Sequence, residues 1–123
     1  MQVLLVDDSK TMRMLVQRAI RQAGFSGFTF IEAENGADAL NKLAAHQPQL
    51  ILSDWNMPEM SGIDFLRHVR SSSNATPFGF ITSEGSNEIY EAAMKEGAQF
   101  LITKPFTPED VRSSLRNVFG GIA

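Results

Sequence analysis

The chain has 123 residues, of which 43% are hydrophobic and 20% are charged, with a formal net charge of −3 and no cysteine. This composition fits one globular domain over residues 1–123, disfavours direct binding of nucleic acid, which usually needs a basic patch, and excludes disulfides and thiolate metal sites. No apolar run approaches the roughly 20 residues that span a bilayer, and residues 1–6 lack the charged leader of a secretory signal, so we expect a cytoplasmic protein without a membrane partner.

Short, continuous apolar runs alternate with stretches in which apolar residues recur at helical spacing. Such runs are typical of strands covered on both faces, and such stretches are typical of helices with one buried stripe. In chain order they predict a strand at 3–6, a helix at 10–23, a strand at 28–33, a helix carrying 37–44, a strand at 50–53, a helix carrying 65–69, a strand at 78–81, a helix at 87–96, a strand at 100–102 and a last helix from 108. Five strands alternating with five helices predict an α/β fold with a doubly wound parallel sheet.

Capping and breaking residues agree with this assignment at most positions. Thr107 can cap the last helix, Pro108 suits its first position, and Asp110 stands where the acid of a capping box is found. We expect this helix to end at Gly120–Gly121. Gly79 is the exception, because it lies inside a predicted strand and has no side chain to pack there.

Polar residues stand directly after four of the five predicted strands. Asp7 and Asp8 follow the first strand, and Asp54 follows the third. Thr82 follows the fourth strand, and Lys104 closely follows the fifth. Ligands of open parallel α/β sheets bind beyond the carboxyl ends of the strands, so we expect these five side chains to share one rim of the sheet.

Such a rim has a definite chemistry. Three crowded carboxylates repel one another, and one takes up a proton unless a cation offsets them. Carboxylate oxygens suit Mg²⁺, while a lysine and a threonine hydroxyl suit the oxygens of a phosphoryl group. A carboxylate can itself attack phosphorus and form an aspartyl phosphate. The residues therefore predict a site for a metal ion and a phosphoryl group together.

Four segments resemble the motifs of one known family. They are Val6–Ser9, Ser53–Gly62, Ile81–Ser83 and Thr103–Phe106. In content and order they are similar to the receiver domains of two-component response regulators, over essentially the whole chain and most closely to the single-domain chemotaxis type. The resemblance implies a flavodoxin-like sheet with strand order 2-1-3-4-5.

The resemblance also implies a role for each acidic residue. Asp54 would be the phospho-acceptor, supplied by a histidine kinase or a phosphotransfer protein in a Mg²⁺-dependent reaction. Asp8, Asp54 and the backbone carbonyl of Asn56 would bind the ion directly, and Asp7 would bind it through a water molecule. Mn²⁺ would be an alternative ion.

The resemblance implies that the remaining motif residues bind the phosphate and respond to it. Lys104 would pair with Asp54 or its phosphate, and Thr82 would move to hydrogen-bond the phosphate. The Lys104–Pro105 peptide is expected to be cis. Leu101 stands where many receivers have an aromatic switch residue, so the resemblance does not extend to coupling through an aromatic ring.

Two further residues, Asn56 and Glu84, match the positions that tune the lifetime of the phosphate in this family. Both are polar here, as in the chemotaxis type, and would help to place an attacking water. A short-lived phosphate is the resulting hypothesis.

The function expected from the resemblance is a signalling switch, in chemotaxis or a phosphorelay, that is not a turnover enzyme. An effector protein would bind the face made by the fourth helix, the fifth strand and the fifth helix. A flavodoxin-like small-molecule binder is one alternative, but residues 7–10 are acidic where a Gly-rich loop would stand. An aspartyl phosphatase is a second, but Asn56 occupies the place of its acid. A receiver that binds partners without phosphorylation is a third.

Overall fold

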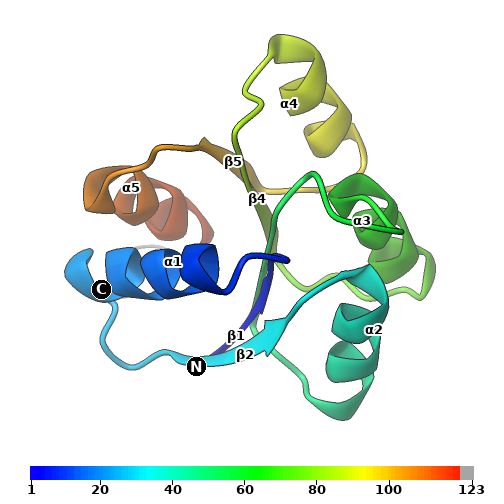
Figure 1. The fold of residues 1–123 in the computed structure, drawn as a ribbon, viewed down its shortest axis with the longest axis horizontal. Coiled ribbons are helices and arrows are strands. Elements are labelled where there is room, and N and C mark those ends of the chain that lie inside the picture. The colour runs from blue at the N-terminus through cyan, green and yellow to red at the C-terminus, as the bar shows by residue number, and fades with distance from the viewer. Residues whose placement is uncertain (120–123) are drawn as a thin grey trace.

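The computed structural model describes residues 1–119, so the predicted helix end at Gly120–Gly121 lies outside the described residues. All ten predicted elements are present in the predicted order (Figure 1). Where both ends of an element were predicted, neither end differs by more than one residue. The strands are β1 (Gln2–Val6), β2 (Thr29–Ala33), β3 (Leu50–Ser53), β4 (Phe78–Thr82) and β5 (Phe100–Thr103). The helices are α1 (Lys10–Gln22), α2 (Gly36–Ala45), α3 (Gly62–Ser71), α4 (Asn87–Lys95) and α5 (Pro108–Phe119).

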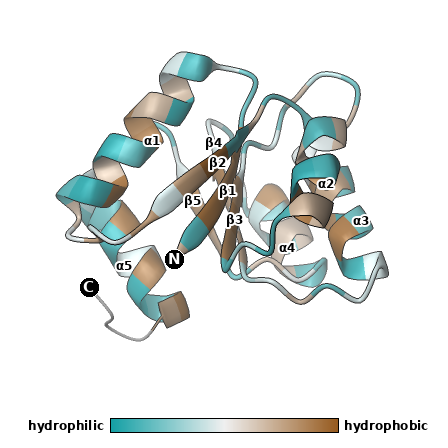
Figure 2. Ribbon diagram, turned by 90° about the horizontal axis from the view of Figure 1, so that it is seen from below, coloured by the Kyte–Doolittle hydropathy of each residue, from teal (hydrophilic) through white to brown (hydrophobic). Residues whose placement is uncertain are grey.

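The five strands form one parallel sheet in the order β2-β1-β3-β4-β5, which confirms the predicted flavodoxin-like topology. Helices α1 and α5 cover one face of the sheet, and α2, α3 and α4 cover the other (Figure 2). Because strand order reverses next to β1, the carboxyl ends of β1 and β3 lie side by side at the point where such folds bind ligands.

Alternate residues of the central strands enter two separate cores. In β1, Val3 and Leu5 pack in the core beneath α1 and α5, whereas Leu4 and Val6 pack in the core beneath α2, α3 and α4. Each side chain of this size stabilises the fold by about 1.5–3 kcal/mol when fully buried. The continuous apolar runs of the sequence therefore arise because both faces of the sheet are covered.

Side-chain caps begin the helices next to the carboxyl rim of the sheet. Ser9 accepts a hydrogen bond from the Met12 N–H at the start of α1, and Ser61 accepts one from the Asp64 N–H at the start of α3. At α5, the Thr107 hydroxyl accepts from the Asp110 N–H while the Asp110 carboxylate accepts from the Thr107 N–H, so the predicted capping box is confirmed. These caps fix where the loops that carry the polar residues end.

The register of the sheet explains why residue 79 is a glycine. It pairs with Phe100 of β5, and a Cβ atom at position 79 would collide with the Phe100 ring. Phe100 is itself buried in the core beneath α1 and α5. The missing side chain in β4 therefore makes room for a large one in the next strand.

Gly79→Ala is expected to lower the free energy of unfolding by about 1–3 kcal/mol, because the added methyl group overpacks the core against Phe100. In a Phe100→Leu background the same change should cost much less, since the two sites are directly coupled. Urea denaturation of the four proteins measures this coupling. Gly27→Ala is the matched control, because nothing lies within 4 Å of its Cβ position and little change is expected. Equal costs in both backgrounds would show that Phe100 is not the reason for Gly79.

Candidate functional site

Three carboxylates meet at the carboxyl ends of β1 and β3. One oxygen each of Asp7, Asp8 and Asp54 lies within 4.8 Å of the others. The Asp54 N–H donates to the Val6 carbonyl at 2.9 Å, which joins the two strand ends. Asp7 is buried and Asp8 is exposed, while the side chain of Asp54 is 12% exposed. The cluster thus opens to solvent on the side of Asp8.

Backbone amides and one ammonium group hold two of these carboxylates in place. Asp7 accepts a hydrogen bond from the Ser9 N–H at 2.9 Å, and Asp54 accepts one from the Trp55 N–H at 2.8 Å. The Nζ atom of Lys104 lies 3.4 Å from an oxygen of Asp7 and 3.5 Å from an oxygen of Asp54. The lysine from the end of β5 therefore bridges the acidic residues of β1 and β3.

The charges at this rim do not balance. Within residues 1–119, Lys104 is the only cation in ion-pair contact with the three carboxylates, so they carry two formal negative charges in excess. Burial raises the pKa of Asp54 above its ordinary value, and the charge of Asp7 raises it further, against the opposing effects of Lys104 and the Trp55 N–H. Hard oxygen donors with excess negative charge are what Mg²⁺ requires, so the residues present fit this ion.

The hydroxyl of Thr82 is engaged with its own loop. Thr82 is fully buried at the end of β4, and its Oγ1 accepts a hydrogen bond from the Glu84 N–H at 3.1 Å. The Thr82 carbonyl accepts from the Lys104 N–H at 2.8 Å, which ties the ends of β4 and β5 together. Thr82 therefore lies at the predicted rim, with its hydroxyl directed to the β4–α4 loop.

The loops after β3 and β4 are joined above the site. Asn56 Nδ2 donates to Glu84 Oε1 at 3.2 Å, and both residues are exposed. The β3–α3 loop closes tightly at Gly62, where a Cβ atom would collide with the Asp54 carbonyl oxygen. The structure thus brings together Asn56 and Glu84, which the sequence places 28 residues apart.

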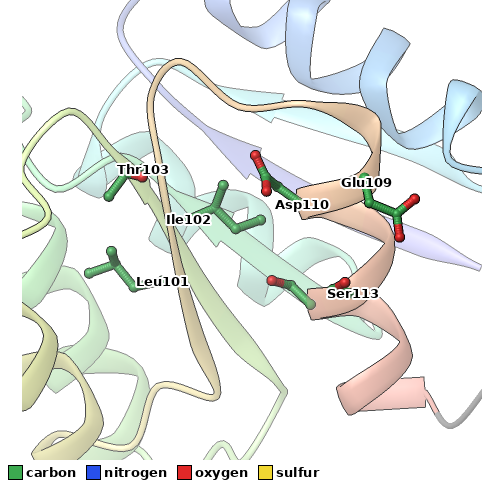
Figure 3. Close-up of a pocket in the computed structure, with 7 residues that line it drawn as sticks. Leu101, Ile102, Thr103, Glu109, Asp110 and Ser113 are labelled. Carbon is green, nitrogen blue, oxygen red and sulfur yellow. The ribbon is translucent and has the colours of Figure 1, made fainter.

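The segment after Lys104 begins as the resemblance implied, because the Lys104–Pro105 peptide is cis. Leu101 of β5 is half-buried and packs at the margin of the core beneath α2, α3 and α4. Beside it, β5 and α5 border an open groove of about 290 Å³ (Figure 3). The residues lining the groove are Leu101, Ile102, Thr103, Glu109, Asp110, Ser113 and Ser114.

Arg13 contacts the backbone of the acidic pair and is absent from the predicted site residues. It is 8% exposed, and it donates from Nη1 to the Asp7 carbonyl at 2.5 Å. A signal for it was present, because Arg13 stands at helical spacing with Val16 and Ile20 on the buried stripe of α1. A charged residue on such a stripe needs a buried partner.

Comparison with known proteins identifies the family. Residues 3–116 match the family model of the response regulator receiver domain, so the chain belongs to this family of signalling domains. It is 39% identical to the chemotaxis protein CheY1 of Helicobacter pylori, with 98% of each chain covered. The structure is similar to that of the Vibrio cholerae chemotaxis protein CheY4, with a TM-score of 0.84 and 35% identity over 95% of this chain and 97% of that one. It is also similar to the receiver domain of a Francisella response regulator, with a TM-score of 0.83 and 25% identity over 96% and 93% of the two chains.

Membership of this family establishes the general class of function. The protein is a response-regulator receiver, and receivers bind Mg²⁺ at an acidic pocket and interact with histidine kinases and effectors. Among the helices of residues 1–119, none is long and apolar enough to cross a membrane.

Asp54→Asn is expected to raise the free energy of unfolding at neutral pH in EDTA, because it removes a buried charge from a repulsive cluster. The pKa of Asp54 is raised in the folded state, so the folded protein binds this proton more readily than the unfolded chain does. The wild type should therefore lose stability relative to the variant as the pH rises from about 3.9, the pKa of an aspartate in the unfolded chain, through the pKa of Asp54 in the folded protein. Urea denaturation across this pH range checks the sign, and a wild type that gains stability over the variant would contradict it.

Proposed function

We propose that Asp54 accepts a phosphoryl group in a Mg²⁺-dependent reaction and thereby switches the binding of a partner protein. The observation that supports this most directly is the convergence of three carboxylates and Lys104 at one rim of the sheet. Positioning and neutralisation of charge supply most of the catalysis in phosphoryl transfer, and both are available at this rim. The protein would assist its own phosphorylation and dephosphorylation without being a turnover enzyme.

The ion would be held by Asp8, Asp54 and the backbone carbonyl of Asn56, with Asp7 acting through a water molecule. Asp8 is the exposed member of the cluster, so its carboxylate is accessible to an ion that enters from solvent. When bound, Mg²⁺ or Mn²⁺ neutralises the carboxylates and the phosphoryl oxygens. The buried Asp7, already bonded to Ser9 and Lys104, is less free to bind directly.

The attacking atom would be Oδ2 of Asp54. Its Oδ1 atom accepts from the Trp55 N–H and faces Lys104, whereas no hydrogen bond within residues 1–119 engages Oδ2. Oδ2 would form the new bond to phosphorus while the bond from phosphorus to the donor's imidazole nitrogen breaks, and that nitrogen keeps the electron pair. Lys104 would then pair with a phosphoryl oxygen.

Thr82 would carry the signal outward. Its hydroxyl would leave the Glu84 N–H and donate to the phosphate, which frees the β4–α4 loop to rearrange. The face made by α4, β5 and α5 would then change its affinity for an effector, with Leu101 and Pro105 as further switch positions. Leu101 packs against aliphatic and aromatic neighbours, which supports repacking rather than rotation of an aromatic ring.

The same proposal includes the phosphodonor, the pathway and the location of the protein. The phosphodonor would be a histidine kinase or a phosphotransfer protein, and the pathway would be chemotaxis or another phosphorelay, in keeping with the chemotaxis relatives. We further propose that residues 1–123 act as one receiver domain in the cytoplasm. A phosphorylation-independent binding module and a flavodoxin-like binder stay as alternatives, and the acidic rim disfavours the second of these.

Incubation with acetyl phosphate and Mg²⁺ is expected to add one phosphoryl group to the wild type, as seen by intact-mass spectrometry. Asp54→Asn should abolish the addition, and so should EDTA, because one removes the nucleophile and the other the cation. Asp64→Asn, a matched change on the exposed surface of α3, should leave it intact. An unmodified wild type would favour the phosphorylation-independent module, and a fully modified Asp54→Asn protein would place the acceptor elsewhere.

Alanine at Asn56 or Glu84 is expected to slow hydrolysis of the Asp54 phosphate several-fold, because the two side chains would jointly place the attacking water. Since they are hydrogen-bonded to each other, the double variant should be little slower than either single variant. Loss of phosphate after removal of the donor, followed by mass spectrometry, measures the three rates. Unchanged decay in both single variants would remove this role.

A further inference from the structure

Arg13 is a buried cation that the proposed phosphoryl chemistry does not use. It lies in the first turns of α1, and its guanidinium group contacts Asp7, which directly follows β1, and Glu32 of β2. Nη1 donates to the carbonyl oxygen of Asp7 at 2.5 Å, and Nε donates to Glu32 Oε1 of β2 at 2.8 Å. Arg13 therefore links α1 to the end of β1 and to the edge of the sheet.

The carbonyl group that Arg13 contacts belongs to the peptide bond between Asp7 and Asp8. Because a peptide group is planar, holding its carbonyl oxygen also fixes where the Cα atom of Asp8 lies. The Asp7 carboxylate has its own supports in the Ser9 N–H and Lys104. Within residues 1–119, no hydrogen bond or ion pair holds the Asp8 carboxylate, so its direction depends on the backbone that Arg13 orients.

The guanidinium group suits this task better than an ammonium group. Its planar fork presents several N–H donors in fixed directions, so it can engage the Asp7 carbonyl and the Glu32 carboxylate together. A lysine at position 13 would keep the charge but has one donor centre, which cannot reproduce both contacts in the same geometry. The ion pair with Glu32 also offsets the cost of burying the charge of Arg13.

We infer that Arg13 is a positioning residue for the cation site, which sets the affinity for Mg²⁺ by orienting the Asp7–Asp8 peptide. This inference rests on the proposed function, which assigns the cation to these carboxylates. Groups that orient metal ligands from behind typically change metal affinity by 10–100-fold when they are removed. The inference concerns geometry, because the Arg13–Glu32 pair is neutral as a unit and adds little net charge to the site.

The decisive comparison uses variants that preserve charge. Arg13→Lys keeps the cation and loses the fork, and the double variant R13Q/E32Q loses both partners with no change in net charge. Both are expected to weaken Mg²⁺ binding about tenfold, equivalent to about 1.4 kcal/mol, as measured by calorimetric titration with MgCl₂. The matched control is R67Q/D64N, which removes an exposed arginine–carboxylate pair on α3 and should bind Mg²⁺ as the wild type does.

A second measurement separates positioning from a purely structural role. Urea denaturation in EDTA gives the stability of each metal-free protein. A structural role alone would lower this stability and leave the Mg²⁺ dissociation constant of the folded protein unchanged, and that result would overturn the inference. Weaker Mg²⁺ binding together with acetyl phosphate modification that recovers at saturating Mg²⁺ would support it.

Failure of the proposed function gives a different pattern. In that case the wild type itself would show no Mg²⁺ binding, whatever the variants do. If R13Q/E32Q does not fold, Arg13→Lys decides the question, because it retains a cation beside Glu32.

Discussion

The repulsion among three carboxylates at adjacent strand ends is the constraint on which the rest of the structure depends. Neighbouring segments supply a positive charge and hydrogen-bond donors that offset this repulsion. The ammonium group of Lys104, which follows β5, and the backbone N–H groups of Ser9 and Trp55 contact carboxylate oxygens. Arg13 contacts the Asp7 carbonyl and so holds the backbone of the acidic pair without offsetting its charge. Burial raises the pKa of Asp54, Lys104 opposes this effect, and the negative charge of Asp7 adds to it. In the proposed function a cation would complete the site, and metal binding and phosphoryl transfer would then share this rim.

Burial of the sheet stabilises the fold enough to tolerate this concentration of charge. Both faces of the central strands are covered, so the residues before each strand end are apolar and anchor it in the cores on either side (Figure 2). Helix caps next to the site then hold the connecting loops without adding charge, since Ser9 and Ser61 bind backbone N–H groups through neutral hydroxyls. Stability therefore comes from the interior of the sheet, and the rim is free to carry interactions that are unfavourable until a ligand binds.

The elements and the rim could be predicted from the sequence because polar residues directly follow apolar runs, and parallel strands all end on one side. The order of the strands came from the resemblance, since local patterns do not specify which strands are neighbours. Contacts between strands were out of reach for the same reason. Gly79 was visibly unusual, but only the pairing of β4 with β5 shows that Phe100 explains it. Arg13 could have been noticed on its apolar stripe, but its partners Asp7 and Glu32 depend on the packing of α1 across two strands.

In the proposed switch, a new hydrogen bond from Thr82 to the phosphate would supply only part of the free energy that shifts the protein. Its hydroxyl now accepts from the Glu84 N–H, and a typical neutral hydrogen bond contributes about 0.5–1.5 kcal/mol. A hydrogen bond to a charged phosphate contributes about 1.5–3 kcal/mol, so exchanging one for the other would favour the phosphorylated arrangement by only about 1–2 kcal/mol. That gain would shift a two-state equilibrium by roughly 5–30-fold, well short of the 10⁴-fold needed for complete conversion. Leu101 has no polar tip with which to form a further hydrogen bond. In the proposed switch the remaining bias would therefore come from repacking of Leu101 or from the partner, which would bind one arrangement better than the other.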